Sequence, residues 1–177
     1  NGFNAACNKG LLDYLDQQLA SHDVLLLQEV KLAPDKQAAA RNLLLSSGYA
    51  HVAINSVAGS SGVLIAVKST LVNPLFTCDI PGCDLPDSRG RVMTMTTADP
   101  PVTIVCACVP FCNPLTPDIA PRCSTFRSHF TTYVSELATN TPSRQRSLIV
   151  AGDLQVALTD NDESATLVPP IPGSTYQ

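Results

Sequence analysis

Two short apolar segments, each leading directly to an acidic residue, constrain the fold of this chain more than any other feature. The first is Val24–Leu27, which Gln28 and Glu29 follow. The second is Leu148–Ala151, which Gly152 and Asp153 follow. Apolar runs of this length predict buried β-strands, and sites in open α/β sheets gather where strands end. Both segments therefore predict strands that deliver a carboxylate to a sheet edge.

Two carboxylates placed in this way suit a divalent-cation phosphodiesterase site, because hard cations such as magnesium prefer oxygen ligands. Taken without any family, however, each acid also has an ordinary explanation. Glu29 could be a solvated strand terminus, and Asp153 could form a turn with its own backbone. Gly152, just before Asp153, allows a close backbone approach or an unusual turn. Gln155 lies two residues after Asp153, so an extended chain would place both on one side. Such a carboxylate and amide could orient a water molecule and take its proton.

Composition indicates a globular chain of roughly one domain. Of the 177 residues, 45% are hydrophobic, which is enough to fill a core, and only 15% are charged. The net charge of -4 and the pI of about 5.2 argue against a broad basic face for nucleic acid. Contact with DNA would then need a local patch drawn from the basic residues Lys31, Lys68, Arg89, Arg91, Arg122, Arg127, Arg144 and Arg146.

The seven cysteines show no C-x-x-C pair and no zinc-like spacing with histidine. We therefore expect free thiols in a reducing, intracellular compartment, which would be the nucleus in a eukaryote. Cys106 and Cys108 should lie buried on one face of a strand. No apolar run approaches the roughly 18 residues of a membrane span, and no feature indicates an obligate protein partner.

Periodicity predicts helices over about 9–20, 35–46 and around Phe126–Leu137. It predicts strands at 24–28, 49–54, 62–68, 91–97, 102–109 and 147–151, with loops at 77–90 and 110–122. No helix is predicted between the strands at 49–54 and 62–68, or between those at 91–97 and 102–109. A purely parallel sheet therefore does not fit, because parallel neighbours need a crossover connection. The order predicts an α/β fold with mixed sheets covered by helices.

Several segments, in order along nearly the whole chain, resemble the exonuclease III and AP endonuclease branch of the endonuclease/exonuclease/phosphatase family, which includes retrotransposon-type endonucleases. The matching segments are Asn1–Ala5, the D-x-L-x-L-Q-E-x-K pattern of Asp23–Lys31, the S-G-V of Ser61–Val63, the G-R-V of Gly90–Val92, the x-P of Val109–Pro110 and the G-D-L-x-V-A of Gly152–Ala157.

This resemblance implies a four-layer α/β sandwich and a phosphodiesterase that depends on Mg²⁺ or Mn²⁺. Glu29 would be a metal ligand, with Asn1 beside the metal. Asp153 would position or activate the attacking water. Gln155 stands where the family has an asparagine that contacts the scissile phosphate, and Cys108 stands where the family has a phosphate-contacting tyrosine.

The chain also departs from the family pattern. Gln155 is one methylene longer than asparagine, and Cys108 lacks the tyrosine hydroxyl. A later aspartate and a closing aspartate–histidine pair have no match, and His22, His51 and His129 lie in other contexts. We therefore expect residues 1–177 to form a single partial domain, incomplete at both ends and without its C-terminal part.

The resulting expectation is a metal-dependent phosphodiesterase that acts on DNA, of the AP endonuclease or 3′-exonuclease type used in DNA repair. This chain alone should lack full activity. Two alternatives stay open. One is a degenerate, non-catalytic copy derived from a retroelement, which Gln155 and Cys108 favour. The other is a related phosphodiesterase with an RNA, lipid or nucleotide substrate, which the acidic pI favours.

Overall fold

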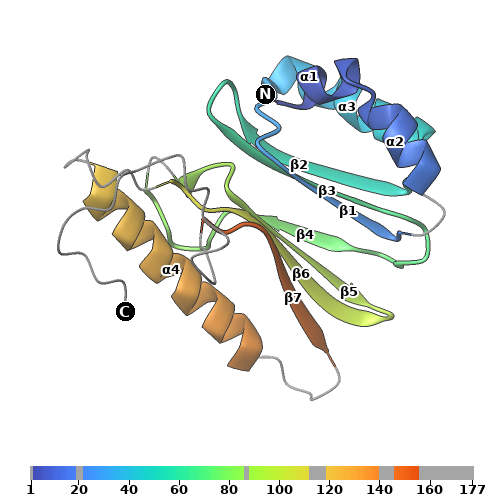
Figure 1. Ribbon diagram of the computed structural model, residues 1–177. Coiled ribbons are helices and arrows are strands. Elements are labelled where there is room, and N and C mark those ends of the chain that lie inside the picture. The colour runs from blue at the N-terminus through green and yellow to red at the C-terminus, as the bar shows by residue number, and fades with distance from the viewer. Residues whose placement is uncertain (1, 19–21, 86–87, 112–118, 140–145, 156–177) are drawn as a thin grey trace, which may run out of the picture.

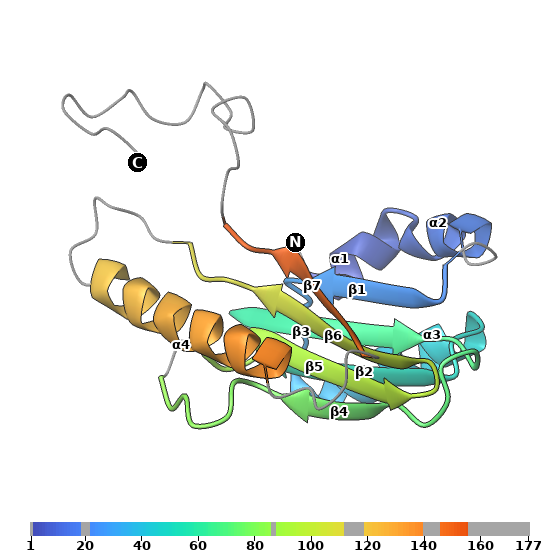
Figure 2. The ribbon, with the colours of Figure 1, turned by 90° about the horizontal axis from the view of Figure 1, so that it is seen from below.

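The computed structural model describes residues 2–18, 22–85, 88–111, 119–139 and 146–155, and these residues form four layers (Figure 1). Helices α1 (Phe3–Asn8), α2 (Leu11–Gln18) and α3 (Pro34–Ser46) cover a three-stranded sheet. A four-stranded sheet packs beneath it, and α4 (Ile119–Thr139) crosses the outer face of that second sheet (Figure 2). The α/β sandwich predicted from the sequence is confirmed.

The first sheet is antiparallel and consists of β1 (Val24–Gln28), β2 (His51–Val57) and β3 (Ser61–Val67) in the order β1-β3-β2. Every residue of β3 is buried, because strands flank it on both sides and helices and the second sheet cover its faces. Residues 58–60 form the turn that joins β2 to β3, and Ser61 and Gly62 already pair with Val57 and Ser56.

The second sheet consists of β4 (Leu75–Cys78), β5 (Val92–Ala98), β6 (Pro101–Cys108) and β7 (Ser147–Asp153), in that order. β4, β5 and β6 are antiparallel, whereas β6 and β7 run parallel with α4 between them in the chain. A parallel pair needs such a crossover. Its register places Asp153 opposite Cys108 at the ends of the two strands.

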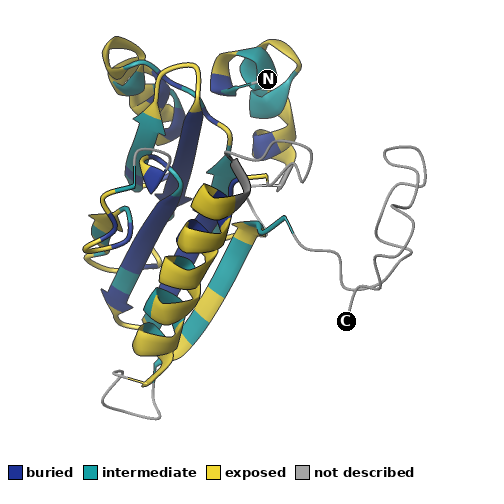
Figure 3. Ribbon diagram, turned by 90° about the vertical axis from the view of Figure 1, so that its left-hand side faces the viewer, coloured by how far each residue is buried: buried dark blue, intermediate teal, exposed yellow. Residues whose placement is uncertain are grey.

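Side chains of β6 alternate between two cores, and every residue from Thr103 to Cys108 is buried. Figure 3 shows the contrast between buried strands and the exposed outer side of α4. Ile104, Cys106 and Cys108 face the first sheet and pack with Ile65 of β3 and with Met93 of β5. Val105 and Ala107 face α4 and pack around Phe126, which is 1% exposed. The prediction that Cys106 and Cys108 share a buried strand face is confirmed.

Four local predictions differ from the structure. Among the described residues, β1 pairs only with β3 and β7 only with β6, so these two strands are half-buried rather than buried. The helix expected over 9–20 begins at Leu11, and α1 was not predicted. β4 lies partly inside the expected loop 77–90. It is an exposed edge strand with no alternating pattern to reveal it. α4 begins at Ile119, inside the expected loop 110–122, because proline is tolerated in a first helical turn.

None of the helices in the described part of the chain is long and apolar enough to cross a membrane.

Gly152 lets β7 approach β6 closely. Its φ is +140°, and a Cβ atom at this position would overlap the carbonyl oxygen of Ala107. The close approach suspected from the Gly-Asp sequence is therefore present. It holds the Asp153 backbone against the end of β6, where the Val109 N–H donates to the Asp153 carbonyl at 2.8 Å.

We predict that Gly152→Ala lowers the free energy of unfolding by about 3 kcal/mol, near the upper end for overpacking a tight contact. Gly82→Ala is the control, because Gly82 also has a positive φ (+75°) but nothing lies within 4 Å of an added Cβ. That change should cost only about 1 kcal/mol of backbone strain. Urea denaturation of both variants measures the difference, and equal losses would contradict the proposed overlap.

Candidate functional site

A cleft of about 440 Å³ lies where strands of both sheets end beside the first turns of α4. It brings together Glu29, Cys108, Asp153 and Gln155, four of the five site residues predicted from the sequence. The fifth, Asn1, lies outside the described residues. The remaining lining residues are Ser60, Ser61, Arg91, Val109, Pro110, Phe111, Arg122 and Cys123.

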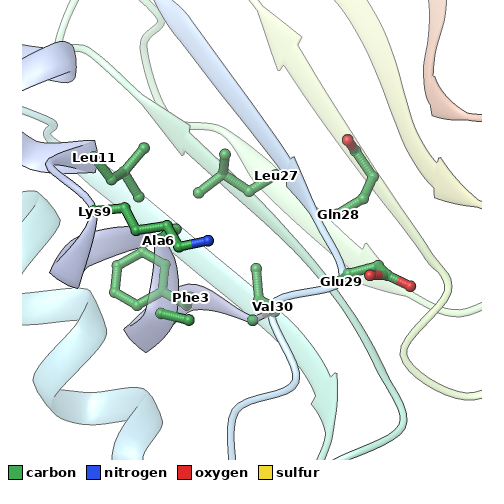
Figure 4. A pocket seen from close by; sticks show the side chains of 10 residues that line it. Phe3, Ala6, Lys9, Leu11, Leu27, Gln28, Glu29 and Val30 are labelled. Atoms are coloured by element: carbon green, nitrogen blue, oxygen red, sulfur yellow. The ribbon is translucent and has the colours of Figure 1, made fainter.

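Glu29 enters the cleft through an unusual backbone turn. In a regular strand, Gln28 and Glu29 would point to opposite faces. Glu29 instead has a φ of +54°, and Figure 4 shows both side chains on the side of β1 opposite to Leu27. The exposed carboxylate pairs with the Lys31 ammonium at 3.4 Å. A left-handed conformation in a non-glycine residue costs about 1–2 kcal/mol, so the surrounding structure must hold it.

Hydrogen bonds to Val30 hold this turn on both sides. The Val30 N–H donates to the Gly62 carbonyl at 3.2 Å, and the Val30 carbonyl accepts from the Phe3 N–H at 3.0 Å. Gly62 fits because a Cβ there would meet the Val30 side chain at 2.5 Å. The S-G-V segment and the start of α1 therefore position Glu29.

A smaller pocket of about 300 Å³ adjoins this turn between α1 and β1 (Figure 4). Phe3, Leu11 and Leu27 provide apolar walls, and the Lys9 side chain lies across it. Glu29 lines both the pocket and the larger cleft, whereas Asp153 lines only the cleft.

Asp153 is held by two hydrogen bonds from Gln155. The Gln155 side-chain Nε2 donates to one carboxylate oxygen at 2.6 Å, and its backbone N–H donates to the other at 3.3 Å. Gln155 has a φ of +52°, which bends the chain back toward Asp153. Arg127 of α4 donates to the Gln155 carbonyl at 3.5 Å. The amide expected to reach toward a phosphate therefore binds the neighbouring carboxylate.

The Cys108 thiol lies in the cleft near both acidic groups. Burial raises its pKa, the nearby charge of Arg91 lowers it, and the charges of Asp153 and Glu29 raise it again. A hydrogen bond with the Glu29 backbone also lowers the pKa. Both carboxylates therefore lie near this thiol, and Asp153 is opposite Cys108 in the register of β6 and β7.

Arg91 is tied to the same strand end. Its backbone carbonyl accepts from the Cys108 N–H at 2.8 Å, and its guanidinium donates to the Cys108 carbonyl at 3.2 Å. Asp79 orients the preceding turn by accepting from the Gly90 N–H at 2.9 Å and from Asn55 at 2.8 Å. The G-R-V segment therefore delivers a cation to the cleft.

The structure sorts the eight basic residues considered as a nucleic-acid patch. Arg91 and Arg122 line the cleft, while Lys31 and Arg127 contact Glu29 and Gln155 at its margin. Arg89 is exposed and does not line the cleft, and its backbone carbonyl accepts a hydrogen bond from the Ser61 hydroxyl at 2.7 Å. Lys68 follows the end of β3, Arg146 precedes the start of β7, and Arg144 lies outside the described residues. A local cationic patch thus exists despite the net charge of -4.

The donor chemistry of the cleft fits a hard divalent cation. Glu29 and Asp153 supply carboxylate oxygens and Gln155 supplies a carboxamide oxygen, which are the ligand types that Mg²⁺ prefers. Within the described ranges, no three side chains of His, Cys, Asp or Glu come together as a ready-made ligand group. A magnesium ion commonly keeps several waters and uses one or two carboxylates with substrate phosphates, so this donor set is compatible with it.

Sequence reasoning missed Phe111 and Cys123 as lining residues, and it named Arg122 only as one of several basic residues. The Pro-rich composition of 110–122 predicted a loop, so the sequence did not indicate that α4 begins at Ile119. None of the three histidines lines the cleft, in agreement with the prediction that they lie in other contexts.

Comparisons with known proteins agree with this fold. The sequence profile of the Endonuclease/Exonuclease/phosphatase family matches residues 1–162. No curated protein matches the sequence. Among solved structures, the 3′ phosphatase NExo from Neisseria, bound to a product DNA hairpin, is 26% identical with a TM-score of 0.64, and the match covers 90% of this chain and 56% of NExo.

Two other solved structures show the same fold at lower identity. The catalytic domain of APE2 from Xenopus laevis is 19% identical with a TM-score of 0.63, and the match covers 88% of this chain and 56% of that domain. An AP endonuclease from Archaeoglobus fulgidus is 18% identical with a TM-score of 0.60, and the match covers 81% of this chain and 50% of that enzyme. The chain thus spans about half the length of these relatives.

We predict that Cys106 resists alkylation near neutral pH. Burial raises the pKa of its thiol to about 11, a hydrogen bond from Gln28 lowers the pKa, and the neighbouring Cys108 raises it. Because the thiolate is the reactive form, labelling should accelerate only as the pH rises toward that value. Iodoacetamide labelling with mass spectrometry should modify the exposed Cys78 first. Equal rates for the two residues at neutral pH would contradict this assignment.

Proposed function

Because the chain belongs to the endonuclease/exonuclease/phosphatase family, we propose that its cleft is part of a Mg²⁺- or Mn²⁺-dependent phosphodiesterase site that acts on DNA. The observation that carries the proposal is the convergence of Glu29 and Asp153 in a cleft that arginines also line. The two acids are 124 residues apart in sequence (153 − 29), so only the fold brings them together.

In this proposal Glu29 holds the cation, while water and phosphate oxygens complete its coordination. A bound cation would polarise the phosphate and stabilise negative charge on the leaving oxygen. Lys31 pairs with the Glu29 carboxylate at 3.4 Å and helps to keep it in place.

Asp153 is the group proposed to orient a water molecule and accept its proton. The two hydrogen bonds from Gln155 restrict rotation of the carboxylate, which defines the direction of its remaining lone pairs. Gln155 would then position Asp153, and Arg91 and Arg122 would contact the phosphate. Guanidinium groups suit this task because they bind phosphate through paired N–H donors.

DNA is the proposed substrate class, and an AP endonuclease or 3′-end activity is the finer proposal. The NExo structure, at 26% identity, contains a product DNA hairpin. The six described cysteines are free thiols, which supports the further proposal that the protein works in a reducing, intracellular compartment.

A non-catalytic nucleic-acid-binding role is the second candidate. It is favoured by the 2.6 Å hydrogen bond that engages the Gln155 amide with Asp153, and by Cys108, which has no phenolic hydroxyl. Asparagine at position 155 is one methylene shorter, so the Gln155→Asn variant would release this contact. A gain of cleavage in that variant would identify a weakened catalytic site.

We predict that Glu29→Gln weakens magnesium binding, because the change removes the charge from the proposed ligand. Calorimetric or NMR titration of the wild type should detect a weak site, since few protein oxygens are available to it. Glu136→Gln is the control, because it makes the same change on an exposed part of α4 that does not line the cleft. Unchanged binding in Glu29→Gln would place the cation elsewhere.

We predict that the chain binds DNA and that Arg122→Ala weakens this binding. Losing one phosphate contact should also reduce the slope of log affinity against log salt by about 1. Arg41→Ala on α3 removes a charge that does not line the cleft and should have little effect. Fluorescence anisotropy over a salt series measures both variants.

The same preparation should not measurably cleave duplex DNA with an abasic site in magnesium. The aspartate–histidine pair implied by the family resemblance has no counterpart in this sequence. Robust cleavage by the chain alone would refute that expectation, and absence of DNA binding would refute the proposed substrate.

A further inference from the structure

Phe111 places an exposed aromatic ring on the wall of the cleft. The residue is 68% exposed although it lies beside buried Val109 and Pro110. Single exposed hydrophobic residues are ordinary on protein surfaces, so exposure alone says little. Phe111, however, lines the same cleft as the two arginines and Asp153. The other exposed large hydrophobic side chains of the described residues do not line it: Tyr14, Leu45, Val57, Val72, Leu75 and Ile149.

The backbone around Phe111 is fixed at two points. On one side, the Val109 N–H donates to the Asp153 carbonyl at 2.8 Å, which ties the segment to the end of β7. On the other side, the Cys123 thiol donates to the Phe111 carbonyl at 3.5 Å, which ties it to α4. Pro110 lies between these contacts and restricts φ to about −65°. The ring is therefore presented by a restrained backbone, which reduces the entropy lost on binding.

The surroundings of this ring match the two chemical parts of a nucleotide. An aromatic face stacks with the π-face of any nucleobase, and guanidinium groups bind its phosphate. Proteins that hold single-stranded nucleic acid combine these features in a groove. Phe111 supplies the aromatic face, and Arg91 and Arg122 supply the cations.

We propose that Phe111 forms a nucleobase-binding subsite that takes an unpaired base next to the phosphate bound in the cleft. This inference rests on the proposed function and adds a substrate preference to it. In an intact duplex both faces of each internal base are stacked, and freeing one costs a few kcal/mol. The subsite therefore favours single strands, frayed ends and positions next to a missing base.

The test compares binding of a short single-stranded oligonucleotide with binding of a hairpin whose stem pairs the same sequence and whose loop is a non-nucleotide linker. Fluorescence anisotropy would be measured for the wild type, Phe111→Ala and Phe111→Tyr, because tyrosine keeps an aromatic face. Tyr14→Ala is the matched control, since Tyr14 is 61% exposed on α2 and does not line the cleft. Circular dichroism would check that each variant is folded.

We expect Phe111→Ala to weaken single-strand binding by about fivefold to a hundredfold, the range that corresponds to loss of one stacked base. Binding of the hairpin should change much less, and Phe111→Tyr and Tyr14→Ala should resemble the wild type. A 2-aminopurine base in the single strand should lose fluorescence on binding to the wild type but not to Phe111→Ala. DNA and RNA versions of the strand distinguish the two sources of an unpaired base.

Each other outcome overturns the inference in an identifiable way. If Phe111→Ala binds the single strand normally while Arg122→Ala binds it weakly, the base subsite is wrong and the phosphate site of the proposed function stands. Equal losses for single strand and hairpin would show that Phe111 does not select unpaired bases. If the wild type binds neither nucleic acid, the proposed function fails and the inference fails with it.

Discussion

The parallel pairing of β6 with β7 is the interaction on which the cleft depends. Its register sets Asp153 opposite Cys108, and the absence of a side chain at Gly152 allows the two backbones to meet. Since α4 connects these strands, its first turns also come to lie beside their ends. One pairing therefore places a carboxylate, a thiol and the cations of α4 around a common space.

Backbone strain is concentrated beside this space. Of the five non-glycine residues with positive φ in the described part of the chain, Glu29, Lys31 and Gln155 lie in or next to the cleft. Each such conformation costs about 1–2 kcal/mol, and hydrogen bonds to Val30 and Asp153 hold two of these turns in place. Strained residues of this kind cluster at functional sites, where they aim side chains that a regular strand would direct elsewhere.

The cleft divides its chemistry among different elements. The ends of β1 and β7 carry the acids, the residue before β5 and the first turn of α4 carry the arginines, and the segment after β6 carries the aromatic ring. Burial raises the pKa of the Cys108 thiol, Arg91 lowers it and the two acids raise it, so charges of both signs lie near this thiol. This separation explains how an acidic protein can present cations in one place. The fold gathers Arg91 and Arg122 in the cleft that the two carboxylates also line.

The sequence by itself determined the local elements and the chemistry at their ends. The apolar run before Glu29 predicted β1 over its observed range, and Gly152 before Asp153 indicated a close backbone approach. It did not reveal α1 or β4, because a six-residue helix and an exposed edge strand leave little periodic signal. Only the tertiary structure decided that Gln155 folds onto Asp153, and that Arg122 and Phe111 join the acids in one cleft. These arrangements depend on positive φ angles and on contacts between residues far apart in the chain, which no pattern of neighbouring residues encodes.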